Sequence, residues 1–512
     1  MKLTIIEKDI TKTLTYDAPV LLSDAARDAG FALEMPCGGG GRCGKCAVEA
    51  EGMLSPRTEK EEALFPSAPT MRLACTTRAM GDARVRIVPR ETMTDIVTGA
   101  DTAAAQTDGG DGCGIAVDIG TTTIAAYLLH LSDGARLSDL GRKNPQSTFG
   151  ADVIARIEHS LAGGGAALQN AVAGCLNEMI AELQRRAGGD AGSLRAVAIT
   201  GNTAMLYLLT GRGVRCLSAA PFAADCLFGD EIPAKTAGLT LPEDVKVYLM
   251  PSISAFVGAD ITAAILSSGM TGHPENTLLV DIGTNGEMAL FSQGRLLCCS
   301  TAAGPAFEGA GLTMGMNALA GAIDRVGLSG GMLVTHTIGG GAARGVCGSG
   351  VIDALAALLT AGALDETGLL DEEHALVAEY QDEPAAQLAP GVYLTGRDVR
   401  ALQLAKSAIC AGMLTLIHHA GLMPEEIGTL YIAGGFGSFI NVKSAAKISL
   451  IPPALAPRAK AIGNAAGAGA SMALLSVRAR EAAARIARTA ETVELSTDPY
   501  FMEKYVDCMM FE

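Results

Sequence analysis

Hydrophobic and polar residues alternate close to the start of the chain, and this alternation predicts a pair of strands. The stretch LTIIEKDITKTLTY (residues 3–16) is typical of a hairpin with its turn near Lys8 and Asp9. The stretch LLSDAARDAGF has the spacing of a short helix that ends at Gly30, and ARVRIVP alternates again as a closing strand. These elements predict one compact unit over residues 1–90.

The periodic pattern is lost after this unit. The segment TGADTAAAQTDGGDG, at residues 98–112, has no hydrophobic period and consists almost entirely of Ala, Gly, Asp and Thr. Such a composition is typical of a flexible segment, because it offers no apolar face to bury. We therefore interpret residues 91–112 as a flexible linker.

From Gly114 onward, apolar strands alternate with amphipathic helices, which predicts an α/β architecture. The stretch GIAVDIGTTTIAAYLL contains a strand, a Gly/Thr turn and a second strand, and TLLVDIGTNGEMALF repeats this pattern about 160 residues later. The repeated DIGT hairpin predicts two similar lobes. We place these lobes at residues 113–275 and 276–477, and we expect residues 478–512 to return to the first lobe.

Two predicted helices are rich in small residues. They lie in DITAAILSSG, in the first lobe, and in GNAAGAGASMALLS, near the end of the second. Because small side chains let helix axes approach closely, we expect these two helices to cross at a hinge between the lobes. Before the second of them, the predicted strand in GTLYIA ends in the Gly-rich turn AGGFGSF.

Composition and charge narrow the function classes. The chain has 512 residues, no Trp and a net charge of −16. Such an acidic chain lacks the basic surface that nucleic acids and anionic membranes require. The first residues, MKLTIIEKDITK, carry charge throughout and lack the apolar region of a signal peptide, and we find no uncharged apolar stretch long enough to span a bilayer. We therefore expect a cytoplasmic protein with no nucleic-acid or membrane partner.

Four of the 13 cysteines have the spacing of metal ligands. Cys37, Cys43 and Cys46 lie in CGGGGRCGKC, with the spacing C-x5-C-x2-C, and Cys75 follows in RLACTT. Two irons need four thiolates in a small volume, and this spacing is close to that of plant-type 2Fe–2S ferredoxins. The glycines let backbone N–H groups approach the cluster sulfurs. Zinc and a disulfide are the alternatives, but four consecutive glycines are unusual for zinc, and a reducing cytoplasm disfavours disulfides.

Each DIGT hairpin is a candidate phosphate site. An Asp at a strand end can hold Mg²⁺ through water, while turn amides and Thr hydroxyls donate to phosphate oxygens. One Asp-x-Gly turn is weak support, but two copies, at Asp118 and Asp281, predict a cleft that clamps a triphosphate from both sides. The AGGFGSF turn would then pass the adenosine. The alternative is an α/β fold with glycine turns and no nucleotide.

Two further acids are candidates for this cleft. Asp260 begins the first small-residue helix, where it either positions a water molecule or only complements the helix dipole. Glu308 lies in the Gly-rich stretch AGPAFEGAGLTMG, and we expect it to reach the cleft or a partner surface. The seven His residues show no metal-ligand spacing, so we give them no chemical role.

The order of these elements resembles the actin, Hsp70 and sugar-kinase superfamily: phosphate loop, hinge helix, second phosphate loop, adenosine loop and hinge helix. The cysteine loop resembles that of the adrenodoxin side of the 2Fe–2S ferredoxins, which have a β-grasp fold. Over nearly all of its length the chain resembles the ATP-dependent reductive activators of corrinoid proteins, which join both parts. Its most specific stretches include NPQSTFGADVIARI, TGNTAMLYLLTG and STAAGPAFEGAGLTMGMNALAGAI. Tyr207 departs from the resemblance, since we expect His at this position.

The resemblance implies an α+β, β-grasp ferredoxin domain followed by a two-lobed α/β actin-like (ribonuclease-H-like) ATPase. It implies ATP-dependent, one-electron reduction of an inactive cobalt(II) corrinoid protein to cobalt(I), with one 2Fe–2S cluster, ATP and Mg²⁺ as cofactors. The partners would be the corrinoid protein of a methyltransferase system and a low-potential electron donor of unknown identity, and a homodimer stays open. The expected site residues are the catalytic Asp118, Asp260 and Asp281, the cluster ligands Cys37, Cys43, Cys46 and Cys75, and the nucleotide-binding residues Gly120, Thr121, Thr122, Thr123, Gly283, Thr284, Asn285, Gly286, Gly434, Gly435 and Phe436.

Three other functions stay open. The chain could be an ATP-driven electron activator of another low-potential enzyme, such as a radical dehydratase. It could also be a small-molecule kinase with a ferredoxin redox module, or a ferredoxin with a nucleotide-sensing scaffold. Dehydratase activators usually share a 4Fe–4S cluster between subunits, whereas here the cysteines belong to one chain, which disfavours the first alternative.

Overall fold

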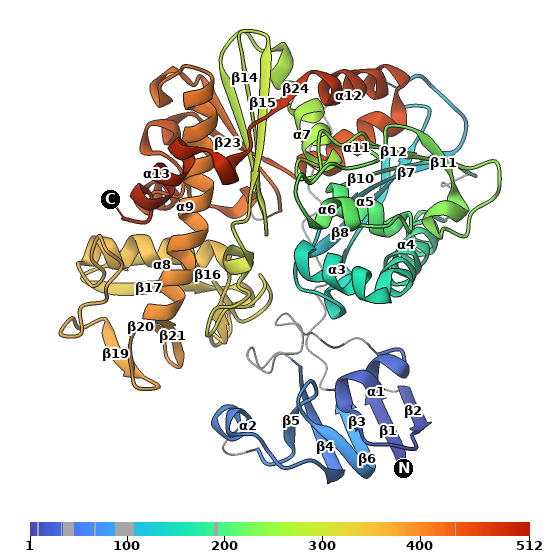
Figure 1. Cartoon of the computed structure of the whole chain (residues 1–512). Coiled ribbons are helices and arrows are strands. Elements are labelled where there is room, and N and C mark those ends of the chain that lie inside the picture. Colours follow the sequence, from blue (N-terminus) through green and yellow to red (C-terminus); the bar gives the residue numbers. More distant parts are fainter. Residues whose placement is uncertain are drawn as a thin grey trace.

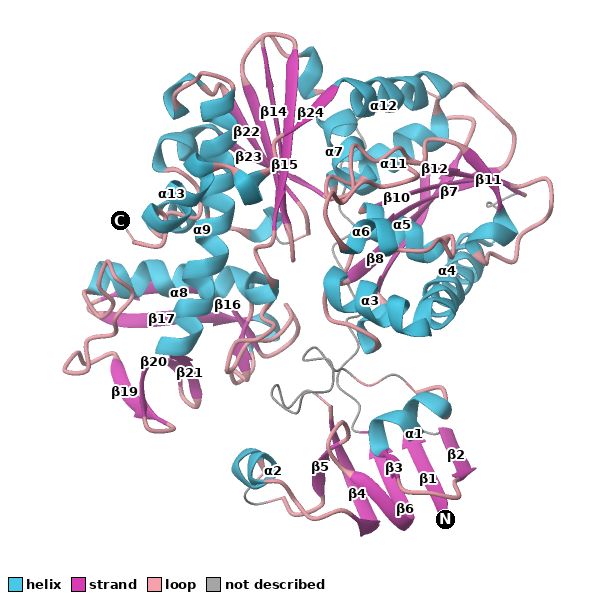
Figure 2. Cartoon of the chain, viewed as in Figure 1, coloured by secondary structure: helices cyan, strands magenta, loops and turns pink. Residues whose placement is uncertain are grey.

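The chain forms three parts that follow one another in sequence in the computed structural model, an N-terminal domain and two larger lobes (Figure 1). The structure describes residues 1–7, 10–31, 33, 46–65, 68–87, 107–188, 193–435 and 437–511. Each of the three parts is built on its own sheet (Figure 2).

The N-terminal domain is a mixed sheet with a short helix packed against it. β1 and β2 form the predicted antiparallel hairpin, and β1 lies parallel to the predicted closing strand, β6. This arrangement confirms the expected β-grasp fold. The helices are α1 (Leu22–Asp28) and α2 (Glu59–Leu64), and the sheet order is β2 (Ile10–Thr15), β1 (Lys2–Glu7), β6 (Arg78–Ile87), β4 (Ala47–Leu54) and β5 (Met71–Leu73), with β3 (Val20–Leu21) beside β6.

Lobe I contains the first DIGT hairpin, formed by β7 and β8, at the centre of its sheet. The sheet order is β11 (Glu231–Pro233), β12 (Lys246–Leu249), β10 (Leu194–Gly201), β7 (Cys113–Ile119), β8 (Thr123–His130) and β9 (Arg136–Lys143). Its helices are α3 (Val153–His159), α4 (Gly165–Ala187), α5 (Thr203–Leu209), α6 (Arg215–Ser218) and α7 (Ala259–Ser268). The strands and helices bury a single continuous apolar core around β7 and β10.

Lobe II contains the second DIGT hairpin, formed by β13 and β14. The main sheet order is β23 (Ala459–Gly463), β22 (Thr429–Ala433), β13 (Thr277–Ile282), β14 (Gly286–Ser292), β15 (Arg295–Thr301) and β24 (Ala490–Thr492). Two smaller sheets are β17 (Met332–Thr337), β16 (Ala322–Ser329) and β18 (Gly345–Val346), and β19 (Val377–Tyr380), β20 (Glu383–Ala389) and β21 (Val392–Thr395). The helices of this part of the chain are α8 (Gly348–Ala361), α9 (Gly396–His419), α10 (Val442–Lys447), α11 (Ala465–Leu475), α12 (Val477–Thr489) and α13 (Pro499–Asp507). The placement of α11 in lobe II is wrong, because its apolar side chains are buried in the core of lobe I.

Five strands of each main sheet have the same arrangement, which confirms the predicted duplication. In lobe I, three antiparallel strands, β7 to β9, are followed on the other side of β7 by the parallel strands β10 and β12. In lobe II, β13 to β15 are antiparallel, and β22 and β23 continue the sheet in parallel on the other side of β13. Both DIGT turns therefore lie at equivalent ends of equivalent strands.

The two small-residue helices, α7 and α11, pack directly against each other, as predicted. A Cβ atom at Gly469 would lie 2.1 Å from the carbonyl oxygen of Ala263, so a larger residue there would push the helices apart. The hydroxyl of Ser267 donates to the carbonyl of Ala465 at 2.7 Å. The two helices lie at the junction of the lobes, because α11 is buried in the lobe I core and α7 shares a buried cluster with strands of lobe II.

Part of the predicted flexible linker is fixed. Residues 98–106 lie outside the described residues, but Thr107 and Asp108 are bound to lobe I and to α11 and α12. The Thr107 hydroxyl donates to the Leu131 carbonyl, and the Asp108 carboxylate accepts hydrogen bonds from the Ser476 hydroxyl and the Val477 amide. The interpretation of residues 107–112 as a flexible segment is therefore wrong, because Asp108 caps the start of α12.

The C-terminal segment also differs from its prediction. Helix α12 contacts lobe I, where Arg480 pairs with Glu231 at 2.7 Å. β24, however, joins the lobe II sheet beside β15, and α13 packs into the lobe II core through Phe501. Residues 478–512 therefore return to lobe I only at α12, because the later apolar side chains find their burial site in lobe II.

Helix α9 is the one helix of the described part of the chain that is long and apolar enough to cross a membrane. It lies inside lobe II, where its apolar side chains are buried against the main sheet. It also buries the charged residues Asp398 and Lys406, which make hydrogen bonds within the lobe.

Candidate functional site

The two DIGT turns face each other across a cleft between the lobes. Each is a tight turn, closed by a hydrogen bond from the Gly120 amide to the Thr123 carbonyl (2.9 Å) in lobe I and from the Gly283 amide to the Asn285 carbonyl (3.1 Å) in lobe II. Their side chains line a cavity of about 810 Å³. Of the expected site residues, the cavity is lined by Asp118, Gly120, Thr121, Thr122, Thr123, Asp260, Asp281, Gly283, Thr284, Asn285, Gly434 and Gly435.

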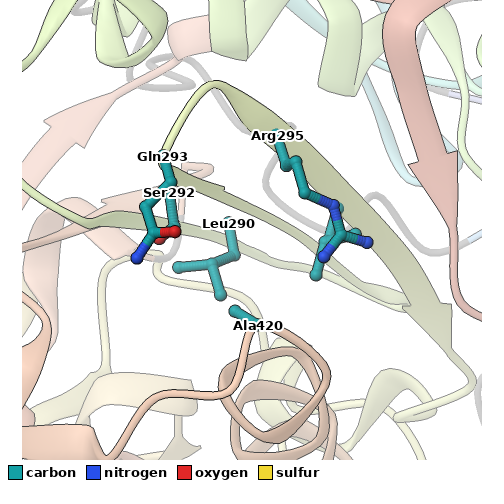
Figure 3. A pocket seen from close by; sticks show the side chains of 6 residues that line it. Leu290, Ser292, Gln293, Arg295 and Ala420 are labelled. Atoms are coloured by element: carbon teal, nitrogen blue, oxygen red, sulfur yellow. The ribbon is translucent and has the colours of Figure 1, made fainter.

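A second hollow lies far from the DIGT turns and is too small for a nucleotide. It has a volume of about 30 Å³ and lies beside the β14–β15 turn, among Leu290, Gln293, Arg295 and Ala420 (Figure 3). The cavity between the lobes is therefore the candidate nucleotide site, and its size suits a ligand of that class.

Three Asp side chains predicted for this site are half-buried around the cavity. Burial raises the pKa of Asp118 to about 7. The hydrogen bond from Asn464 opposes this rise, and the charge of Asp281 adds to it. Burial likewise raises the pKa of Asp281 to about 6. The pKa of Asp260 is raised to about 8 by burial and by the charges of Asp118 and Asp281. Acidic side chains are thus concentrated in the cleft, and among the described residues no cation forms an ion pair with any of these three.

Sequence reasoning missed a fourth carboxylate, Glu287. It lies directly opposite Asp281 in the register of β13 and β14, is 7% exposed, and lines the same cavity. Its Oε1 atom has no hydrogen-bond partner among the described residues, and burial raises its pKa well above the usual value. The cross-strand position is the clue that could have revealed it, because residues paired across a hairpin lie on the same face of the sheet.

These acids fit a hydrated divalent cation. Within the described ranges, no three Asp, Glu, His or Cys side chains converge closely enough to hold a bare metal ion. Mg²⁺ usually keeps several of its waters and binds through one or two carboxylates together with phosphate oxygens. Asp118, Asp260, Asp281 and Glu287 line a roomy cavity, and Glu287 has an oxygen without a partner among the described residues. This arrangement matches the water-mediated binding of Mg²⁺ that the sequence predicted.

Buried polar side chains fix the first phosphate loop from below. Arg156 is fully buried and donates to the Thr121 carbonyl at 2.6 Å. Asn144 donates to the Gly120 carbonyl, and Asn202 donates to the Thr121 hydroxyl. Burial lowers the pKa of Arg156 to about 10, and Arg156 forms no ion pair with the residues that the structure describes. A positive charge therefore stands beneath the loop with no carboxylate in direct contact.

Glu308 reaches the cleft, one of the two places expected for it. Its Oε2 accepts a hydrogen bond from the Thr122 hydroxyl at 2.5 Å, and its Oε1 accepts one from the Thr284 hydroxyl at 2.7 Å. The two hydroxyl oxygens lie 3.5 Å apart. One carboxylate thus joins both phosphate loops.

The Gly-rich turn after β22 approaches the second phosphate loop closely. A Cβ atom at Gly434 would lie 2.5 Å from Oδ1 of Asp281, and the backbone has a φ of 91° there, so only glycine fits. Gly434 and Gly435 line the cavity, whereas Phe436 lies outside the described residues.

Two of the four predicted cluster ligands come together in the N-terminal domain. The sulfur atoms of Cys46 and Cys75 are buried and lie 3.2 Å apart, well beyond the length of about 2.05 Å of a disulfide bond. The Ala74 amide donates to the Cys46 carbonyl at 3.0 Å, which joins the two segments. Two thiols that converge without a covalent bond fit an iron–sulfur cluster. Cys37 and Cys43 lie outside the described residues.

Tyr207, the departure from the expected His, is buried in α5. Its hydroxyl donates to Asp225 at 2.5 Å and accepts from the Cys226 amide at 2.8 Å. It therefore holds a loop of lobe I in place and does not line the cavity.

Comparison with known proteins covers all three parts of the chain. Residues 5–80 match the 2Fe–2S iron–sulfur cluster binding domain, residues 113–273 the RACo middle region, and residues 275–512 the C-terminal domain of RACo, the ASKHA domain. The corrinoid activation enzyme RamQ of Eubacterium limosum is 36% identical over 419 residues, which are 78% of this chain and 70% of RamQ. The chain belongs to the family of reductive activators of corrinoid proteins.

Other members of the family support this assignment. The solved structure titled reductive activator for corrinoid, iron–sulfur protein has a TM-score of 0.72 and 28% identity, with coverage of 99% of this chain and 98% of that one. The [Co(II) methylated amine-specific corrinoid protein] reductase of Methanosarcina barkeri is 26% identical over 373 residues, 66% of each chain. The solved structure therefore has the same fold as this chain over almost its whole length.

Proposed function

We propose that this chain reduces the cobalt(II) centre of a corrinoid protein to cobalt(I) in a one-electron step that ATP binding and hydrolysis drive. The observation that carries this proposal is the presence, in one chain, of a convergent thiol pair in a ferredoxin domain and of two facing phosphate loops. The names of the relatives, an activation enzyme and a cobalt(II) corrinoid protein reductase, support the same reaction.

In the cleft, the residues of this chain would divide the work of binding Mg-ATP. Asp118 and Asp281 hold the hydrated Mg²⁺, and Thr121, Thr122, Thr284 and Asn285 donate to the phosphates. Gly434 and Gly435, with Phe436, pass the nucleoside as bare backbone. Asp260 lies in the first turn of α7, where its Oδ1 accepts from the Ile261 amide at 3.0 Å, and its other oxygen would orient a water molecule.

In the ferredoxin domain, Cys37, Cys43, Cys46 and Cys75 would hold the 2Fe–2S cluster. A cluster of this type stores and releases one electron at low potential. Glu61 fixes the turn that carries Cys75, because its Oε1 accepts hydrogen bonds from the Leu73 amide and the Thr77 hydroxyl, both at 2.8 Å. A fixed turn keeps the Cys75 sulfur in place while the cluster changes charge.

ATP is needed because the electron moves uphill. A gap of roughly 200 mV costs about 5 kcal/mol for one electron, at about 59 mV per tenfold change in the equilibrium constant. Binding of nucleotide between lobes that meet at α7 and α11 would favour one lobe arrangement, and the cobalt(II) partner would bind that arrangement better. The electron donor upstream is an unidentified low-potential reductant.

The test measures ATP hydrolysis and cobalt(I) formation together under anaerobic conditions. We expect a cobalt(II) corrinoid protein to stimulate ATP hydrolysis and to show the absorbance of cobalt(I) only when ATP and a reductant are both present. ATP consumption that depends on a small hydroxylated or carboxylated compound, with no response to the corrinoid protein, would favour the kinase alternative instead.

A further inference from the structure

The bridge formed by Glu308 occupies the place where a phosphate group would be bound. The hydroxyls of Thr122 and Thr284 come from the two facing phosphate loops, and both donate to the one carboxylate. A Thr hydroxyl has a single proton to donate. Neither Thr can therefore donate to Glu308 and to a phosphate oxygen at the same time, so the nucleotide and Glu308 compete for the same two donors.

Charge makes this competition unequal. A triphosphate carries several negative charges, and the Glu308 carboxylate would lie within a few ångströms of the terminal one, where like charges repel. Burial lowers the pKa of the buried Arg156, and the charges of Asp152 and Glu308 oppose this effect. Bound phosphates would supply the negative charge near Arg156 in place of Glu308.

Glu308 is connected to the framework of lobe II. It ends a short helical turn (Pro305–Glu308) that begins after Gly304, whose amide donates to the Thr284 carbonyl at 2.9 Å. A few residues later, the amide and hydroxyl of Thr313 both donate to Asp398, at 2.7 and 3.0 Å. Glu308 therefore lies only five residues before this buried contact.

Asp398 controls the start of α9. It is 2% exposed and forms a capping box with Thr395, in which its carboxylate accepts a hydrogen bond from the Thr395 amide at 3.0 Å. α9 runs through lobe II, and Lys406 on this helix holds the C-terminal segment by donating to the carbonyls of Cys508 and Met510. The start of α9 thus connects the cleft to the remote end of the lobe.

We propose that Glu308 is a positioning residue that holds the Thr122 and Thr284 hydroxyls in place of a phosphate of ATP, and that nucleotide binding displaces it and so signals to α9. The inference rests on the proposed function, since it requires ATP to bind between the two DIGT turns. It predicts that Glu308 opposes ATP binding, whereas a residue that held the cation would favour it.

The test compares the variant Glu308→Gln with the wild-type full-length holoprotein. Gln keeps the shape of the side chain but removes the charge, so Mg-ATP should bind about fivefold more tightly or better. AMP has no terminal phosphate to meet Glu308, so its affinity should stay unchanged. The matched control Glu372→Gln removes one charge from an exposed position of lobe II and should change neither affinity.

Amide hydrogen exchange distinguishes the proposed role of Glu308 from a merely structural one, because a structural role would not change how exchange responds to nucleotide. In the wild type, Mg-ATP should change the exchange of peptides that span residues 304–316 and 396–400. In Glu308→Gln, the same peptides should show the nucleotide-bound pattern before nucleotide is added. If this variant fails to fold, Glu308→Asp, which is too short to reach both hydroxyls, should show a smaller tightening, about twofold.

Unchanged or weaker ATP binding by the Gln variant would overturn the proposal, and weaker binding would identify Glu308 as a group that favours the cation. An unaltered exchange response in the variant would also overturn it. If the wild-type protein binds ATP and reduces cobalt(II), but Glu308→Gln does not change ATP affinity, only this inference is refuted. If the wild-type protein binds no nucleotide, both this inference and the proposed function are refuted.

Discussion

The ferredoxin domain and the cleft both bury carboxylates, but they surround them in opposite ways. Burial by itself would raise the pKa of Glu61, yet hydrogen bonds from Thr58, Leu73, Arg72 and Thr77 outweigh it and lower the pKa to about 2. In the cleft, Asp118, Asp260, Asp281 and Glu287 have few donors, and burial raises the pKa of each.

The difference separates a structural acid from acids that await a ligand. Glu61 is fully buried, and its ion pair with Arg72 at 3.1 Å makes the site complete within the protein. The four cleft acids are incomplete until a cation enters, because buried charges require a partner. A buried carboxylate whose hydrogen-bond and charge partners all belong to the protein therefore has a structural role. A buried carboxylate that lacks such partners is instead a candidate for binding a ligand.

The largest expected effect tests whether the two regions work independently. Cys75→Ser should lose the cluster and all cobalt(II) reduction, because a hydroxyl replaces one of four thiolate ligands. Nucleotide binding should stay normal, since the lobes have their own cores. Iron content, visible absorbance and ATP affinity measure these outcomes. Zinc in place of iron in the wild-type protein would refute the redox assignment.

Asp281→Ala is the converse change, in the cleft. It should keep the cluster but lower the rate of Mg-ATP hydrolysis by about 100-fold or more, because an acid that orients the cation is lost. Hydrolysis rates and iron content are measured in the same preparation. Glu372→Ala, at an exposed position of the same lobe, is the control. Normal hydrolysis in Asp281→Ala would contradict the assignment of the DIGT turns.

Glu61→Gln tests the comparison by removing the negative charge that pairs with Arg72 in the ferredoxin domain. The change leaves Arg72 buried without a counter-charge, which typically costs 3–5 kcal/mol, so we expect a loss of about 4 kcal/mol for the ferredoxin domain. Loss of cluster absorbance during guanidinium unfolding measures it. Glu62→Gln, on the exposed side of α2, should change little. Equal effects of the two variants would show that the ion pair does not hold the Cys75 turn.

The smallest effect is the dependence of stability on pH, which should have opposite signs in the two regions. The cleft acids have raised pKa values of about 6 to 8, so the folded lobes hold protons that the unfolded chain releases. Without Mg-ATP, the unfolding temperature of the lobes should therefore fall by a few degrees as the pH rises through this range. Mg-ATP should remove most of this dependence.

Glu61 should behave in the reverse way. Its contribution is fully present above the usual pKa of 4.5 and is lost as the pH falls towards 2. Calorimetry in a chelating buffer, with cluster absorbance recorded in parallel, separates the two transitions. Lobes that become more stable as the pH rises from 6 to 8 would contradict the interpretation of the cleft acids.

Much of the fold was predictable because its signals are local. The β1–β2 hairpin, α1, both DIGT hairpins and the two small-residue helices each follow from a periodic pattern within about 15 residues. The duplication of the lobes was also visible, since the same hairpin motif occurs twice. The interpretation of residues 107–112 failed because Asp108 is fixed by Ser476 and Val477, which are more than 360 residues away in sequence.

The sequence by itself determined the classes of site: four cysteines with ferredoxin spacing, and two Asp-ended hairpins that predict phosphate binding. Only the tertiary structure decided that Arg156 lies beneath the first phosphate loop and that Glu308 joins Thr122 to Thr284. It also decided that β24 completes the sheet of lobe II. The physical reason is that periodicity specifies which face of an element is buried, whereas the partner that a buried polar group meets depends on how distant segments pack together.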